Sequence, residues 1–126
     1  MKYSDTIDVP VLDEGLWFYR DALELSEVSR PVATYVILKC GDSQIGLIEK
    51  PAGSKPAEGT NEVRRYQRHW TPVHIDFHVD DFEAFLAKAV NAGAKCERRF
   101  EGGTHPPIAF CSDPFGNGFC VVGTAT

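Results

Sequence analysis

The stretch HIDFHVDD, residues 74–81, predicts a β-strand that leads directly into a helix. Its odd-numbered positions are apolar, so one face of the strand would pack against a core. His74, Asp76 and His78 would share the opposite face, because side-chain direction reverses at every residue. Three groups that can bind a metal or move a proton on one face raise three possibilities: a metal site, an acid–base site or the polar wall of a pocket.

A second stretch, TIDVPVLD at residues 6–13, resembles the first in a register that aligns Thr6 with His74. Both have the same alternation of apolar and polar positions, and Asp8 coincides with Asp76. An acidic residue precedes the helix in each copy, where it would accept hydrogen bonds from unpaired backbone amides. Internal similarity of this kind predicts a duplicated structural unit.

Helical sequence follows each strand. In the second copy the apolar residues recur at helical spacing, and Gly93 supplies the stop. That apolar stripe consists of Phe82, Phe85, Leu86, Ala89 and Val90. In the first copy Trp17 coincides with Phe85, so we expect Trp17 to lie in the core.

Strand-like sequence that closes in a hairpin follows each helix. YVILKC and SQIGLIE flank Gly41-Asp42 in the first copy, and PIAFC and GFCVV flank SDPFGN in the second. One further strand is expected in each half, at 25–33 and 95–101. The sequence therefore predicts an α+β fold of two tandem βαβββ modules within one domain, 1–126. The modules would span about 3–49 and 71–123.

The connection at 50–70 is rich in proline, glycine and charged residues. It is longer than most loops within a domain, and a lid, a dimer arm and a surface loop all remain open. Arg64, Arg65 and Arg68 in this connection could contact an anionic group or a partner, or form a solvated charged run.

Composition narrows the class of protein. The chain of 126 residues has a formal net charge of −5, which argues against nucleic acid as the main partner. No apolar run approaches the roughly 20 residues that span a bilayer, so no membrane association is expected. The N-terminal sequence lacks a secretory pattern, and the four cysteines form no CxxC pair. We therefore expect a cytoplasmic protein with reduced thiols.

The paired βαβββ pattern, with FYRDAL after the first strand and DPFGNGF before the last, resembles the vicinal oxygen chelate superfamily. This superfamily includes glyoxalase I, extradiol dioxygenases, fosfomycin-resistance enzymes and bleomycin-resistance proteins. The resemblance implies curved sheets around a concave cavity, often in a homodimer. It covers nearly the whole chain and is strongest in the second half.

In metal-dependent members of that superfamily, ligands come from the first and last strands of each module. The resemblance places these positions at His74, Thr6 (Ser4 without a gap), Gly46 and Cys120. His74 is the best single candidate for a metal ligand, whereas glycine and a hydroxyl are poor ones. The resemblance therefore implies that most of the usual metal site is lost, and no metal cofactor is expected.

The predicted ligand-binding residues are Asp8, Trp70, His74, Asp76, His78 and Cys120. Residues two apart on a strand are separated by about 7 Å, so His74, Asp76 and His78 would share one ion only with unusual bending. Asp8 and Asp76 would face the cavity, as an acid–base pair, as a counter-charge for a cationic ligand, or bonded to neighbouring polar groups. Trp70 could stack on a flat ligand.

The resemblance, together with the loss of metal ligands, implies a small-molecule-binding protein similar to bleomycin-resistance proteins, which would sequester a planar or cationic compound. The alternative is a lyase, isomerase or dioxygenase that uses His74 with Cys120, Asp76 or Glu49 to hold zinc, nickel, iron or manganese. A third possibility is an interaction module whose cavity is filled by side chains.

Overall fold

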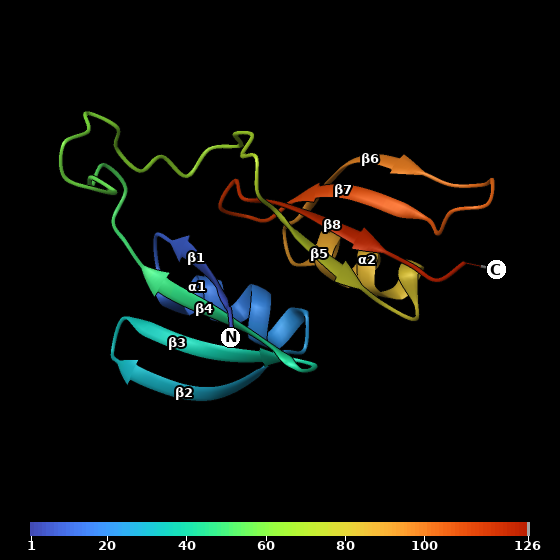
Figure 1. The fold of residues 1–126 in the computed structure, drawn as a ribbon, viewed down its shortest axis with the longest axis horizontal. Helices are drawn as coiled ribbons and strands as arrows, with labels where there is room; N and C mark the ends of the chain where they lie inside the picture. The colour runs from blue at the N-terminus through green and yellow to red at the C-terminus, as the bar shows by residue number, and fades with distance from the viewer. Residues whose placement is uncertain (126) are drawn as a thin grey trace. The chain divides into compact units, whose positions relative to one another are not determined.

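The computed structural model describes residues 1–125, over which the chain forms two four-stranded mixed sheets, each with its own helical segment (Figure 1). Two compact units, 1–66 and 67–126, contain one sheet each. This arrangement confirms the predicted α+β fold of two βαβββ modules. The boundary between the units lies within the predicted connection at 50–70.

The first unit contains β1 (Asp5–Val9), α1 (Leu12–Leu16) and a π-helical turn, η1 (Trp17–Ala22). Its strands β2 (Ser26–Val32), β3 (Tyr35–Cys40) and β4 (Ser43–Glu49) complete a sheet of order β1-β4-β3-β2. Strand β1 is parallel to β4, and the other neighbours are antiparallel. Large apolar side chains from the helix and the sheet form the core, among them Phe18, Tyr19, Val36, Leu38 and Leu47.

The second unit repeats this plan with β5 (Ile75–His78), α2 (Phe82–Asn91), β6 (Lys95–Phe100), β7 (Ile108–Ser112) and β8 (Gly118–Val122). The sheet order is β5-β8-β7-β6, with β5 parallel to β8. Helix α2 packs on β6 and β8. The aromatic rings of Phe77, Phe85 and Phe119 meet between the helix and the sheet.

The first strand and helix do repeat, but the predicted register between the two copies is wrong. The residues that precede the two helices are Val11 and Asp81, so these two positions correspond. In this register Leu12 matches Phe82 and Leu16 matches Leu86, and all four side chains are buried.

The corrected register changes the counterpart of His74. That counterpart is Ser4, the ungapped alternative, and Thr6 corresponds to Asp76. The sheets agree, because Thr6 lies opposite Gly46 in the β1–β4 pair as Asp76 lies opposite Cys120 in the β5–β8 pair.

The two helices begin differently, and only one of the two predicted acidic caps is correct. The Asp81 carboxylate accepts a hydrogen bond of 3.1 Å from the Ala84 amide at the start of α2. Asp13 lies inside α1 and is not its cap. The Leu12 amide instead donates a 2.8 Å bond to the carboxylate of Glu49 at the end of β4. This use of Glu49 gives it a structural role.

Replacing Asp81 with alanine is expected to reduce the free energy of unfolding by about 1 kcal/mol, because the first turn of α2 loses its cap. Urea denaturation of the wild-type protein and Asp81→Ala measures the difference. Asp80→Ala, which removes an equal charge one residue earlier, is the control. Equal losses in the two variants would contradict a capping role.

Trp17 is 57% exposed, so its predicted place in the core is wrong. The corrected register matches Trp17 with the exposed Ala87, and not with Phe85. The neighbouring Phe18 and Tyr19 are buried instead, with their rings 4.8 Å apart in an edge-to-face arrangement. Val90, predicted to belong to the apolar stripe of α2, is also 43% exposed.

The first part of the connection folds back on itself, and Arg64 pairs with Asp8 of β1 in the first unit. The Gly53 amide bonds to the Arg64 carbonyl, the Arg64 amide to the Ser54 carbonyl, and the Tyr66 hydroxyl to the Lys50 carbonyl. Residues 67–74 belong to the second unit. Within residues 1–125, none of the helices is long and apolar enough to cross a membrane.

Candidate functional site

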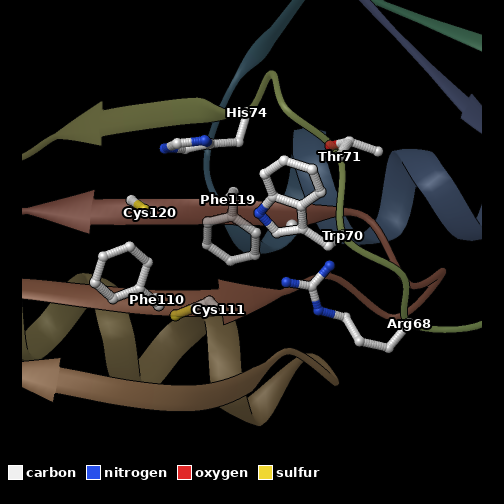
Figure 2. A pocket seen from close by; sticks show the side chains of 9 residues that line it. Arg68, Trp70, Thr71, His74, Phe110, Cys111, Phe119 and Cys120 are labelled. Atoms are coloured by element: carbon white, nitrogen blue, oxygen red, sulfur yellow. The ribbon is translucent and has the colours of Figure 1, made fainter.

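A pocket in the second unit opens between the segment that leads into β5 and the strands β7 and β8 (Figure 2). Its volume is about 90 Å³. The lining residues are Arg68, Trp70, Thr71, His74, Phe110, Cys111, Gly118, Phe119 and Cys120. Three of the predicted site residues therefore meet here: Trp70, His74 and Cys120.

Aromatic side chains dominate the exposed part of this pocket. Trp70 is 79% exposed and Phe110 is 39% exposed. Phe110 is held by edge-to-face contact with Phe100, at a centroid distance of 5.6 Å, and the Arg98 guanidinium covers the other ring of that pair. Large exposed rings beside a concavity provide a surface on which a flat molecule can stack.

Arg68 brings a positive charge to the same pocket. Its Nε and Nη2 donate hydrogen bonds of 2.7 and 3.1 Å to the two oxygens of Glu97 on β6. This pairing with Glu97 raises the pKa of Arg68, so the guanidinium stays charged. Gly118 permits the arrangement, since a Cβ there would lie only 3.1 Å from both terminal guanidinium nitrogens.

His74, Asp76 and Cys120 form a cluster of three potential metal ligands. One donor atom from each lies within 4.8 Å of the others, and His74 Nε2 is 3.1 Å from Asp76 Oδ1. Residues two apart on a strand were expected to approach one another only with unusual bending of their side chains, and the side chains of His74 and Asp76 do bend together in this way. Asp76 lies directly opposite Cys120 in the β5–β8 register.

The Cys120 thiol is held in its protonated form. Burial, followed by the neighbouring Asp76 carboxylate, raises its pKa to about 11. A metal ion would have to displace that proton, because the thiolate is the ligand form. The three donor atoms (nitrogen, oxygen and sulfur) suit zinc, which is a borderline-soft ion. They do not match the two-histidine, one-carboxylate ligand set of iron oxygenases.

The corresponding positions of the first unit do not offer metal ligands. Ser4 and Thr6 have only hydroxyl groups, and Gly46 has no side chain. A Cβ at Gly46 would lie 2.9 Å from the Tyr35 hydroxyl oxygen and 3.2 Å from Thr6 Oγ1. The side chain of Tyr35 therefore fills the space that a carboxylate would need. These residues do not fit the ligand set expected of a metal-dependent member.

Asp8 and His78, the remaining predicted site residues, do not line this pocket. Asp8 belongs to the first unit, where it accepts a 2.7 Å hydrogen bond from Arg64 Nε. Of the alternatives predicted for Asp8, this contact supports a bond to a neighbouring polar group. His78 is exposed at the end of β5. The pairing of Asp8 with Asp76 across a cavity stays a prediction.

Six of the lining residues were not identified as pocket residues from the sequence: Arg68, Thr71, Phe110, Cys111, Gly118 and Phe119. The position of Phe110 in PIAFC could have indicated its place in a pocket. It alternates with the buried Ala109 and Cys111, so its aromatic ring lies on the face of the strand away from the core. The arginines of the connection were interpreted as contact residues or as a solvated run. Arg64 and Arg68 make close ion pairs with Asp8 and Glu97, whereas Arg65 is 67% exposed and makes only a long, 3.9 Å pair with Glu62.

Comparison with known proteins identifies relatives by family and by fold. The model of a family described as "Glyoxalase-like domain" matches residues 5–122. No curated protein matches the chain.

Solved structures with similar folds include a lactoylglutathione lyase from Agrobacterium tumefaciens, with 19% identity and a TM-score of 0.67, covering 98% of this chain and 92% of that one. The fosfomycin resistance protein FosX from Listeria monocytogenes has 12% identity and a TM-score of 0.74, with coverages of 99% and 93%. A variant of that FosX in complex with Mn(II) and a dihydroxypropylphosphonic acid has 14% identity and a TM-score of 0.70, with coverages of 96% and 88%. At these identities the likeness shows the fold.

Proposed function

The chain belongs to the glyoxalase-like domain family, and so to the vicinal oxygen chelate superfamily, and from this premise we propose that it binds a small planar organic compound in the pocket of the second unit. Binding does not require a metal ion, and neither nucleic acid nor a membrane takes part. The role is capture of the compound, similar to that of the bleomycin-resistance proteins in this superfamily.

The aromatic wall of the pocket is the observation that carries this proposal. Trp70 and Phe110 expose ring surface at one pocket, where a flat molecule could cover it, and Arg68 lines the same pocket. The guanidinium charge favours a planar compound with a neutral or anionic substituent over a cationic one. The volume of about 90 Å³ is well below the roughly 300–1,000 Å³ of drug-sized sites, so the pocket would enclose one ring.

A thermal-shift screen of planar aromatic compounds, followed by NMR of the indole N–H groups, tests the proposal. The chain has two tryptophans, one in each unit, so the two indole signals report the units separately. We expect hits that raise the melting temperature and shift the Trp70 signal while leaving Trp17 unchanged. Shifts confined to Trp17, or no stabilising compound in a broad screen, would contradict the proposal.

A metal-dependent lyase, isomerase or dioxygenase is the second candidate, and the convergence of His74, Asp76 and Cys120 within 4.8 Å favours it. In that case these three side chains would hold a divalent ion, which would supply Lewis-acid chemistry to an oxygen of the substrate. Trp70 and Arg68 would still orient the substrate. The FosX variant crystallised with Mn(II) shows that a protein of similar fold can bind such an ion.

Elemental analysis of freshly purified protein distinguishes the two candidates. We expect zinc, nickel, iron and manganese to be far below one ion per chain, because the first unit lacks its ligands. Near-stoichiometric metal that disappears in His74→Ala would instead support the enzyme. His78→Ala is the control, since it removes a histidine from the same strand but outside the cluster.

The homodimer expected from the resemblance is part of the same proposal. Sedimentation equilibrium would give twice the chain mass of 13.9 kDa if the dimer forms. A single-chain mass at all concentrations would remove this part and leave ligand binding in place.

A further inference from the structure

Two cysteines lie directly opposite each other on neighbouring antiparallel strands of the second unit. Cys96 on β6 is the register partner of Cys111 on β7. Directly opposed residues in such a pair have Cα atoms about 4.5–5.5 Å apart and point to the same face of the sheet. This separation falls within the range of about 4.4–6.8 Å that a disulfide bond spans.

The two thiols differ in their access to solvent. Cys96 is exposed, whereas Cys111 is 1% exposed. Burial is the main reason that the pKa of Cys111 rises to about 12, and the adjacent Cys96 thiol raises it further. A dissolved reagent would therefore reach Cys96 first, with Cys111 beside it as the second partner.

This pair reaches the ligand pocket in two ways, because Cys111 is one of the lining residues and Glu97 connects Cys96 to Arg68. Glu97 follows Cys96 and lies at the shift in register between Cys96 and Arg98, where β6 departs from regular pairing. Its carboxylate holds Arg68, and Arg68 lines the pocket and lies against Gly118. A change in the position of Cys96 would therefore move the adjacent residue, Glu97. The ion pair between Glu97 and Arg68 would pass this movement on to the guanidinium.

We propose that Cys96 and Cys111 form a reversible disulfide by exchange with small-molecule disulfides, and that this bond repositions Arg68 in the ligand pocket. The bond itself is independent of the proposed function, whereas the effect on the pocket as a ligand site rests on it. The pair is a modification site separate from the cluster of His74, Asp76 and Cys120.

The exchange balances with glutathione disulfide as the oxidant. The Cys96 thiolate attacks one sulfur of glutathione disulfide, which forms a mixed disulfide and releases one glutathione thiolate. The Cys111 thiolate then attacks the Cys96 sulfur and displaces the second glutathione. In total the protein loses two thiol hydrogens, and one glutathione disulfide becomes two glutathione molecules.

Mass spectrometry of the full-length protein in glutathione redox buffers tests the bond. After the remaining thiols are alkylated and the protein is digested, we expect a pair of peptides joined by a disulfide between Cys96 and Cys111. Reduction should return both cysteines to free thiols. Cys96→Ser should abolish the joined pair, and Cys40→Ser should leave it unchanged. Persistent glutathione on Cys96 without the joined pair, or a bond to a different cysteine, would overturn the proposal.

Tryptophan emission tests the connection to the pocket. In a Trp17→Phe background, oxidation should change the Trp70 emission of the protein and leave that of Cys96→Ser unchanged. Glu97→Gln should still form the disulfide but show a smaller emission change. If the disulfide forms and the emission of Trp70 stays constant, the connection through Glu97 is wrong. These measurements use no ligand, so a failed ligand screen would not affect them.

Discussion

Replacing Gly116 with alanine is expected to reduce the free energy of unfolding by about 4 kcal/mol, because the left-handed backbone and a steric clash act together. Gly116 has a φ of 89° in the turn between β7 and β8. An added Cβ would lie 2.4 Å from the carbonyl oxygen of Gln67 and 2.8 Å from the Arg68 amide nitrogen. The backbone that precedes the pocket would have to move.

Gly102→Ala is the matched control for this experiment. Its φ of 88° imposes nearly the same backbone strain, but among the described residues a Cβ there would meet no heavy atom within 4 Å. We expect Gly102→Ala to cost about 1–2 kcal/mol. Urea denaturation followed by circular dichroism measures both variants. Equal losses would show that the close approach of residues 67–68 to the turn is not maintained in solution.

Trp70→Ala is expected to weaken binding of a planar compound by about tenfold to a hundredfold, because the largest stacking surface of the pocket is lost. Intrinsic stability should change little, since the side chain is 79% exposed. Isothermal titration calorimetry with a compound from the thermal-shift screen measures the change in affinity.

Trp17→Ala is the control, because it removes the same side chain from an exposed position in the first unit. Its affinity should match that of the wild-type protein. Trp70→Phe should recover part of the lost affinity, since a smaller ring still stacks. Full affinity in Trp70→Ala would show that stacking on Trp70 does not contribute to binding.

The sequence predicted the second unit well because its local signals agree. Alternating apolar residues, the Asp81 cap, most of the helical stripe and the turn at SDPFGN all favour the same unit, and each is where it was expected. The turn is held by the buried Asp113 carboxylate, which accepts bonds of 2.9 Å from the amides of Phe115 and Asn117. Such short-range contacts are visible in a sequence of a few residues.

The first unit was predicted less accurately because its local signals conflict. Chance identities between TIDVPVLD and HIDFHVDD favoured the register that aligns Thr6 with His74, whereas burial and the starts of the helices align Ser4 with His74. The cap of α1 comes from Glu49, which is 37 residues away in sequence. A π-helical turn follows, and it changes which residues face the core. Neither feature leaves a local pattern.

The pocket was predicted in part. His74 and Cys120 were identified through the repeat and the resemblance, and Trp70 as a large aromatic residue that could stack on a flat ligand. These three side chains do lie together. Arg68 was not identified, because its place depends on Glu97 in a strand 29 residues away and on the absence of a side chain at Gly118. The convergence of His74 and Asp76 depends on side-chain torsions, which strand spacing alone does not specify.

A crystal structure of the protein with a compound from the screen tests the central claim most directly. If a planar compound binds without metal, we expect electron density for a flat ring against Trp70 and Phe110, with any anionic substituent directed toward Arg68 and no metal ion between ligand and protein. Density at residues of the first unit alone, or a ligand coordinated to an ion held by His74, Asp76 and Cys120, would contradict it.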